Sequence, residues 1–236
     1  MQLRTRVVLQ LAALCLLAAS SFAATNAYLY VVNAIPGRDL ADNLNPGYPI
    51  DILINGKDCL VRNLSFGNSD GPYTLAAGTY TLAISESNSL APCSNAPVIN
   101  SSVTLKPRDN TSAVAAINAD APVLVTLPDD LGPVTPGNGR FVFANVADAS
   151  ELEATLTQLN VKTPQTFTVT ATPGTENWIG IPEGTYSVRI TESGGTTVLT
   201  SQNITLQDQS VTLAYAAGEE LNNTVELVTR VVRAVF

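Results

Sequence analysis

The sequence contains no histidine, and this absence removes much of enzyme chemistry from consideration. Histidine is the commonest general base and metal ligand near neutral pH, so Ser-His-Asp and Cys-His catalysis and most zinc or iron sites are excluded. A phosphate-binding or dinucleotide-binding glycine motif is also missing, because Gly137-Asn-Gly139 is too short for either. We therefore expect a protein that is not an enzyme and holds no cofactor or metal.

Charged residues are few, and basic residues are fewer still. Lys, Arg, Asp and Glu make up 14% of the chain, with 12 basic and 20 acidic residues and a net charge of −8. The acidic residues are scattered, whereas nucleic acids and anionic membranes require clustered Lys and Arg. Neither partner is expected. The abundance of Thr, Ser, Asn and Val with frequent Gly and Pro is typical of short strands joined by turns.

The first 23 residues have the organisation of a cleaved signal peptide. Arg4 and Arg6 precede an apolar segment at 7–19, and residues 21–23 form a small-x-small cleavage site. The apolar segment is too short to span a bilayer, so we expect no membrane insertion after cleavage. Cys15 follows Leu14 rather than a small residue, which argues against lipid attachment. The mature chain, with net charge −10, would be exported to the periplasm, the cell surface or the medium.

One strand pattern occurs twice, at residues 75–87 and 181–193. In each copy a glycine (Gly78, Gly184) precedes a tyrosine by two residues, and apolar residues then alternate with polar ones. This period of two predicts a half-buried strand. Tyr80 and Tyr186 are expected to form tyrosine corners, in which the ring lies in the core and the hydroxyl bonds to nearby backbone.

The surrounding chain predicts short strands, organised in two repeats. Asn55-Gly56 is a hairpin turn between strands at 50–54 and 59–64, and 65–72 is predicted to be a further turn. The remaining strands of the first half are predicted at 28–33, 98–105, 111–117 and 123–127.

The fold class expected from these strands is all-β. We predict two tandem immunoglobulin-like or transthyretin-like antiparallel β-sandwiches: a first domain at 27–127, a Pro- and Gly-rich linker at 128–138 and a second domain at 139–236. Residues 150–158 are ambiguous, because Ser150-Glu-Leu-Glu153 also resembles a helix capping box. The repeat favours a strand there.

Two cysteines are predicted to form a disulfide. Cys59 and Cys93 both belong to the first repeat, and Cys93 lies in a loop that makes this repeat five residues longer than the second. In an oxidising compartment such a bridge stabilises by about 3–4 kcal/mol.

Three groups of polar or aromatic residues are weaker candidates for a site. An oxygen-rich loop suggests calcium but lacks the spacing of a known calcium loop, so a solvated loop is favoured. An acid group could serve glycoside hydrolysis, but nothing implies a cleft. The single tryptophan, Trp178, is predicted to fill the core rather than to stack on sugars. The calcium candidates are Asp39, Asp42, Asn43 and Asn45, and the acid group is Asp148, Glu151 and Glu153.

The first repeat resembles a known family. Its apolar opening strand, the Ile50–Gly56 hairpin, the Leu64–Gly67 turn and the Gly-Thr-Tyr strand are similar to the secreted bacterial and archaeal family catalogued as domain of unknown function 4397. The second half lacks the Asn-Gly hairpin and the Phe-Gly turn, and Asn33 and Asn145 stand where this family usually has histidine. The resemblance implies an exported sandwich, often in tandem, with no established activity.

Our first hypothesis is a non-catalytic exported module that binds an unknown protein or glycan partner or serves as an envelope component. The loops at 35–49 and 88–97 are the expected contact surface, and the long apolar strand at 225–236 could add to a partner's sheet. The alternative is a carbohydrate-binding module with calcium-supported loops and Trp178 as a stacking platform. An enzyme using Asp148 or Glu151 comes third. The ligand, the envelope layer and the oligomeric state stay open.

Overall fold

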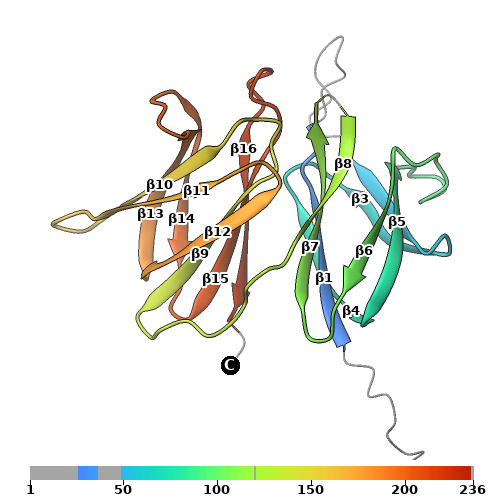
Figure 1. Ribbon diagram of the computed structural model, residues 1–236, viewed down its shortest axis with the longest axis horizontal. Coiled ribbons are helices and arrows are strands. Elements are labelled where there is room, and N and C mark those ends of the chain that lie inside the picture. Colours follow the sequence, from blue (N-terminus) through green and yellow to red (C-terminus); the bar gives the residue numbers. More distant parts are fainter. Residues whose placement is uncertain (1–25, 37–48, 120, 235–236) are drawn as a thin grey trace, which may run out of the picture.

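The computed structural model describes residues 26–36, 49–119 and 121–234, and these stretches form strands and turns without a helix (Figure 1). No apolar helix long enough to cross a membrane occurs among them. The first eight strands are β1 (Asn26–Asn33), β2 (Ile50–Ile54), β3 (Asp58–Leu64), β4 (Ser69–Ala76), β5 (Gly78–Glu86), β6 (Ile99–Leu105), β7 (Asn110–Asn118) and β8 (Ala121–Leu127). The next eight are β9 (Asn138–Asn145), β10 (Leu152–Gln158), β11 (Thr166–Ala171), β12 (Thr175–Pro182), β13 (Gly184–Glu192), β14 (Val198–Leu206), β15 (Ser210–Ala217) and β16 (Glu226–Arg233).

The two halves have the same topology. In the first, the sheets run β4-β1-β7-β8 and β3-β2-β5-β6; in the second they run β12-β9-β15-β16 and β11-β10-β13-β14. Each half therefore repeats the other at an offset of eight strands. The predicted all-β fold with two sandwich units is confirmed. The pairing is antiparallel except for one parallel pair in each unit, β1 with β7 and β9 with β15.

The four sheets stack in a row, with three apolar cores between them (Figure 1). Strand β1 shows how: Ala27, Leu29 and Val31 point into the core of the first sandwich, and Tyr30 and Val32 point into a core shared with the second. The central strands β1, β7, β9 and β15 are thus covered on both faces. Strands covered on both faces are continuously apolar rather than alternating, which explains the opening runs of the two repeats.

The segment between the sandwiches is docked rather than free. Asp129, Leu131 and Val134 are buried, and the last two belong to the shared core. Arg140 fixes the same segment: its guanidinium donates to the carbonyl oxygens of Asp130 (2.9 Å) and Pro133 (3.1 Å) and pairs with the Asp130 carboxylate at 3.0 Å. The predicted linker composition is present, but its apolar side chains hold it against both sandwiches.

Three strands, β4, β11 and β12, were missed from sequence, and one ambiguity is resolved. Residues 65–72 are not simply a turn, because β4 begins at Ser69 and pairs with β1. Gly71 and Pro72 concealed it, yet proline is tolerated at a sheet edge and β4 is an edge strand. Its counterpart β12 was missed in the second unit. The strand prediction for 150–158 is confirmed by β10.

Two repeated polar contacts tie the sheets together. Tyr80 and Tyr186 each donate a hydrogen bond from Oη to the carbonyl oxygen four residues earlier, at 2.7 Å in both units. This is the geometry expected of a tyrosine corner. Asn33 and Asn145 are fully buried at the ends of β1 and β9, and their Nδ2 atoms donate to Leu64 O (2.8 Å) and Ala171 O (3.3 Å). The asparagines therefore have the same structural role in both repeats.

Candidate functional site

The loop between β5 and β6 is anchored by a buried carboxylate. Asp51 on β2 is 1% exposed, and its two oxygens accept hydrogen bonds from the backbone N–H groups of Asn63 (2.8 Å), Asn88 (3.1 Å) and Cys93 (2.8 Å). Burial by itself would raise the pKa of Asp51, but these N–H donors outweigh it and lower the pKa below its ordinary value. Asp51 is thus a charged anchor for the start and the middle of the loop, and it ties both to β3.

The predicted disulfide closes the same loop. Cys59 on β3 is bonded to Cys93, with 5.8 Å between their Cα atoms. Asn88 adds a local cap, because its Oδ1 accepts from the N–H groups of Leu90 and Ala91, both at 3.1 Å. The result is an ordered loop at 88–97 in which no residue is buried and Leu90 is 95% exposed.

Removal of the disulfide should measurably destabilise the chain. The bond closes 34 residues, so the double replacement Cys59→Ser and Cys93→Ser is expected to lower the free energy of unfolding by about 3–4 kcal/mol. Urea unfolding of the oxidised wild type and the variant measures the difference. An unchanged midpoint would show that Asp51 and Asn88 hold the loop without the bond.

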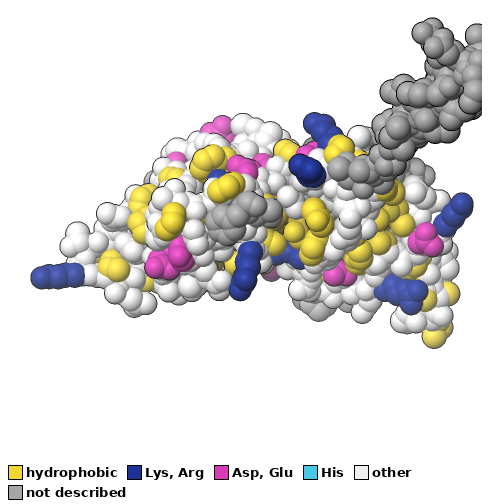
Figure 2. All heavy atoms as spheres, turned by 90° about the horizontal axis from the view of Figure 1, so that it is seen from below, with side chains coloured by type: hydrophobic (Ala, Val, Ile, Leu, Met, Phe, Trp, Pro, Cys, Tyr) yellow, Lys and Arg dark blue, Asp and Glu magenta, His cyan; other side chains and the backbone are white. Residues whose placement is uncertain are grey.

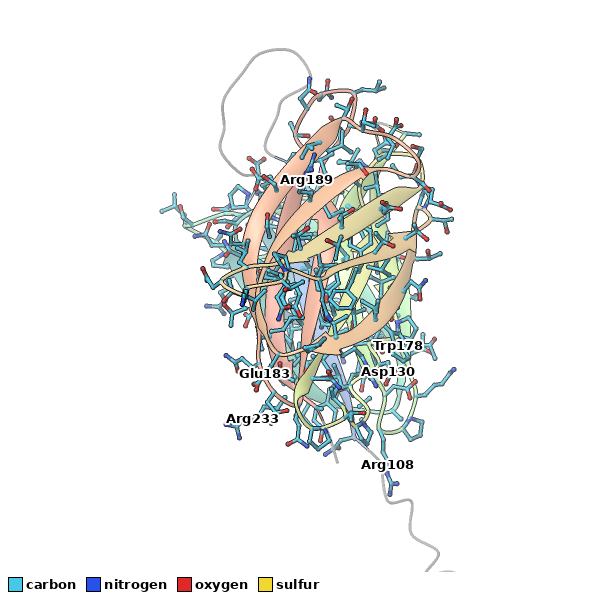
Figure 3. The ribbon with its side chains drawn as sticks, turned by 90° about the vertical axis from the view of Figure 1, so that its left-hand side faces the viewer. Arg108, Asp130, Trp178, Glu183, Arg189 and Arg233 are labelled. Atoms are coloured by element: carbon cyan, nitrogen blue, oxygen red, sulfur yellow. A yellow bond between two sulfur atoms is a disulfide. The ribbon has the colours of Figure 1, made fainter. Side chains whose placement is uncertain are left out.

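Trp178 corrects a sequence prediction, because it does not fill the core. It lies on the edge strand β12 and is 50% exposed, since an edge strand has no neighbour on one side to cover a large ring. The Arg140 guanidinium carbon lies 4.6 Å from the ring centroid, a cation–π contact. Trp178 and Arg140 line a hollow of about 210 Å³ with Thr135 and Asn138. Figure 3 shows Trp178 and Asp130 close to each other in the lower part of the view, and the Arg108 side chain extends below them.

A buried polar chain crosses the core shared by the two sandwiches. Ser112 on β7 donates from Oγ to Asp129 Oδ2 at 2.7 Å, and its Oγ lies 2.8 Å from the hydroxyl of Tyr215 on β15. Asp129 is 5% exposed, and its Oδ1 has no hydrogen-bond partner among the described residues. Burial raises the pKa of Asp129 to about 7, against smaller opposing effects of the Ser112 hydrogen bond and the Arg230 charge.

Two further ionisable side chains lie around this chain. Arg230 on β16 stacks over Tyr30 of the other sandwich, 4.4 Å from the ring centroid, and donates to the Gly71 carbonyl oxygen. Burial, together with the charges of Asp129 and Asp130, raises the pKa of Glu176 on β12 to about 7. The contact between the sandwiches therefore joins an apolar core to carboxyl groups that ionise only near neutral pH.

Among the contacts of the described residues, none joins the acidic candidates Asp148, Glu151 and Glu153 to one another. Asp148 lies in an isolated bridge with Glu219, and Glu153 accepts a hydrogen bond from Thr155 on its own strand. The calcium candidates at 39–45 and the signal peptide lie outside the described residues. Among the residues that are described, no group of three or more Asp, Glu or Cys side chains is placed to hold a metal ion. Asp109, Asp129 and Asp130 line an open hollow of about 430 Å³, but they too are not placed to hold a metal ion together.

Sequence reasoning missed Asp51 and Asp129. Asp51 had one available signal, an acidic residue in the middle of an otherwise apolar strand in the repeat that also carries the cysteines. Asp129 had none, because an Asp in a Pro- and Gly-rich segment after a strand is ordinary loop composition. Its burial depends on how the two sandwiches pack, which a local pattern does not contain.

The family described as Domain of unknown function (DUF4397) matches residues 27–155, more than half of the chain. The chain belongs to this family. The DUF4397 match begins in β1 and ends within β10, so it spans the first sandwich, the docked segment and the start of the second sandwich. A comparison with curated proteins finds no match.

Similar solved structures are remote. The chain is similar to the Bacillus anthracis TIE protein (12% identity, TM-score 0.24), covering 83% of this chain but about a third (32%) of that protein's length. It is also similar to candidate cell adhesion proteins from Bacteroides uniformis (11% identity, TM-score 0.28, covering 89% of this chain and 99% of that one) and Bacteroides fragilis (12%, 0.22, 89% and 98%). Likenesses this weak carry no functional argument for this DUF4397 protein.

Proposed function

We propose that this protein is a non-catalytic exported module of the cell envelope or surface, and that its second sandwich is a second, diverged DUF4397 copy. The observation that carries the proposal is the core shared by the sandwiches, which joins four sheets into one body. A body of this kind holds loops at its two ends in a fixed relation, as a binding or structural module requires. The Cys59–Cys93 bond supports export, because disulfides persist in oxidising compartments.

The surface is consistent with a protein or glycan partner rather than nucleic acid. On the face in Figure 2, acidic and basic side chains are scattered among uncharged ones, and no large patch has one sign. With a net charge of −8, the chain has no electrostatic attraction to polyanions.

Export and surface exposure can be tested together. In intact cells, a membrane-impermeant amine reagent is expected to label the exposed side chains of Lys57 and Lys162, and N-terminal sequencing should begin after Ala23. Unprocessed, unlabelled protein in the cytoplasm would contradict the proposal. Hydrolysis of an ester, glycoside or peptide panel that disappears on replacing Asp148 or Glu151 would instead support an enzyme.

Glycan binding is the second candidate, and the exposure of Trp178 favours it. A half-exposed indole beside Thr135 and Asn138 offers a stacking face next to polar groups. On a glycan array, wild-type protein should bind at least one saccharide class and Trp178→Ala should lose that binding. Calcium-supported loops add a second readout, a rise in melting temperature with calcium. A silent array with no shift in melting temperature leaves only the first candidate.

A further inference from the structure

The loop at 88–97 is more ordered than its packing explains. None of its residues is buried, so it adds no side chain to the cores. It is nevertheless fixed by the Cys59–Cys93 bond, by two N–H groups bonded to Asp51, and by the Asn95 side chain, which donates to Glu86 O at 3.0 Å. Ordering an exposed loop costs conformational entropy that burial does not repay here.

Order of this kind has a use in recognition. A loop that is rigid before binding loses little entropy when a partner closes over it, so more of the contact energy appears as affinity. The second sandwich lacks these anchoring contacts. Its connection from β13 to β14 is short, contains Gly194 and Gly195, and has no cysteine. The anchoring is therefore particular to one loop and is not a requirement of the fold.

The tip of the loop is apolar and uncharged. Leu90 is 95% exposed and is followed by Ala91 and Pro92, both exposed. From Ser87 to Leu105 the chain carries no charged side chain. A lone exposed leucine is ordinary on a protein surface, but one held at the tip of a fixed, uncharged loop is placed for insertion.

We propose that the loop at 88–97 docks onto a partner protein by inserting Leu90 into an uncharged apolar pocket on the partner's surface. This rests on the proposed function and names the contact and the chemistry of the partner. A lipid surface fits less well, because membrane-binding loops and helices combine apolar residues with Lys or Arg. This loop has apolar residues but no Lys or Arg. A glycan also fits less well, because the tip offers no aromatic ring for stacking.

The experiment uses the full chain and a matched control. Leu221, in the turn between β15 and β16, is also 95% exposed. Photo-reactive benzoylphenylalanine replaces Ser89 in one protein and Asn223 in another, and each is irradiated on native envelopes. The protein cross-linked from position 89 is identified, purified and titrated with wild type, Leu90→Ser and Leu221→Ser.

We expect Leu90→Ser to weaken binding roughly 10- to 100-fold. Leu221→Ser should change binding less than about twofold, within the range of surface substitutions.

The contrary outcomes separate the docking proposal from the proposed function. If the purified partner binds Leu90→Ser as tightly as wild type, the docking proposal is wrong and the binding module stands. If position 223 gives the adduct and position 89 does not, the contact lies on the other loop. Binding to phosphatidylcholine–phosphatidylglycerol vesicles that is lost in Leu90→Ser would replace the protein pocket with a lipid. If neither position gives a discrete adduct, the docking proposal fails, and binding at the Trp178 hollow is tested separately by the glycan array.

Discussion

Replacement of Val114 by aspartate is expected to separate the two sandwiches and to lower the free energy of unfolding by about 3–5 kcal/mol. Val114 on β7 is fully buried in the shared core, and its neighbours across the sheet are Val32 and Val125. An aspartate there is no larger than valine and does not overpack the core, so its main cost comes from burying a carboxylate without a partner. Urea unfolding measures the loss, and small-angle scattering should show a larger radius of gyration.

The matched control is Val231→Asp. Val231 lies on β16 and is 47% exposed, so the same chemical change leaves the new carboxylate in water. Its free energy of unfolding should stay within about 0.5 kcal/mol of wild type. If Val114→Asp behaves like Val231→Asp, the shared core does not hold the sandwiches together.

The second large effect is a loss of stability as pH rises towards neutrality. The pKa of Asp129 is about 7 in the folded protein, against 3.8 for the unperturbed group. The folded state therefore binds this proton more tightly than the unfolded state. The stability contributed by Asp129 is therefore fully present below pH 4, falls between pH 4 and 7, and is lost above pH 7. A shift of roughly three pH units corresponds to about 4 kcal/mol as an upper bound, and Glu176 adds in the same direction.

Asp129→Asn tests this effect, because asparagine stays neutral at every pH. The difference between the unfolding free energies at pH 5 and pH 8 should shrink in the variant, and at pH 8 the variant should be the more stable protein. At pH 5 the variant should be no more stable than wild type, because the Asp129 carboxyl is already neutral there. The new amide group also lies where Oδ1 of Asp129 has no hydrogen-bond partner within the described part of the chain. Asp58→Asn, an exposed change, should keep the wild-type pH dependence. A slope that Asp129→Asn leaves unchanged would show that Asp129 is ionised in the folded protein.

The strands that could be predicted from sequence are those whose pattern is local. The alternation after Tyr80 and Tyr186 marks β5 and β13, and Asn55-Gly56 marks the β2–β3 hairpin, because side-chain periodicity and positive φ angles are properties of a few adjacent residues. Strand β4 escaped because Gly71-Pro72 breaks its pattern. The internal repeat was the strongest signal, since it decided between strand and helix for 150–158.

The candidate site depends on contacts between residues far apart in the sequence, which local sequence patterns do not reveal. The disulfide followed from comparing the two repeats, but the Asp51 anchor joins residues 12, 37 and 42 positions apart. The exposure of Trp178 depends on β12 being an edge strand, which is a property of sheet order. The burial of Asp129 arises only when two whole sandwiches meet.

The most direct test of the account is the distance between the outer ends of the two sandwiches. Spin labels replace Lys57, in the β2–β3 turn, and Lys162, between β10 and β11; both residues are exposed. Pulsed electron paramagnetic resonance at pH 6, where Asp129 is mainly protonated, should give one narrow distance distribution, which broadens when Val114→Asp is added. A broad distribution in the wild-type background would contradict the claim that the shared core joins the sandwiches into one body.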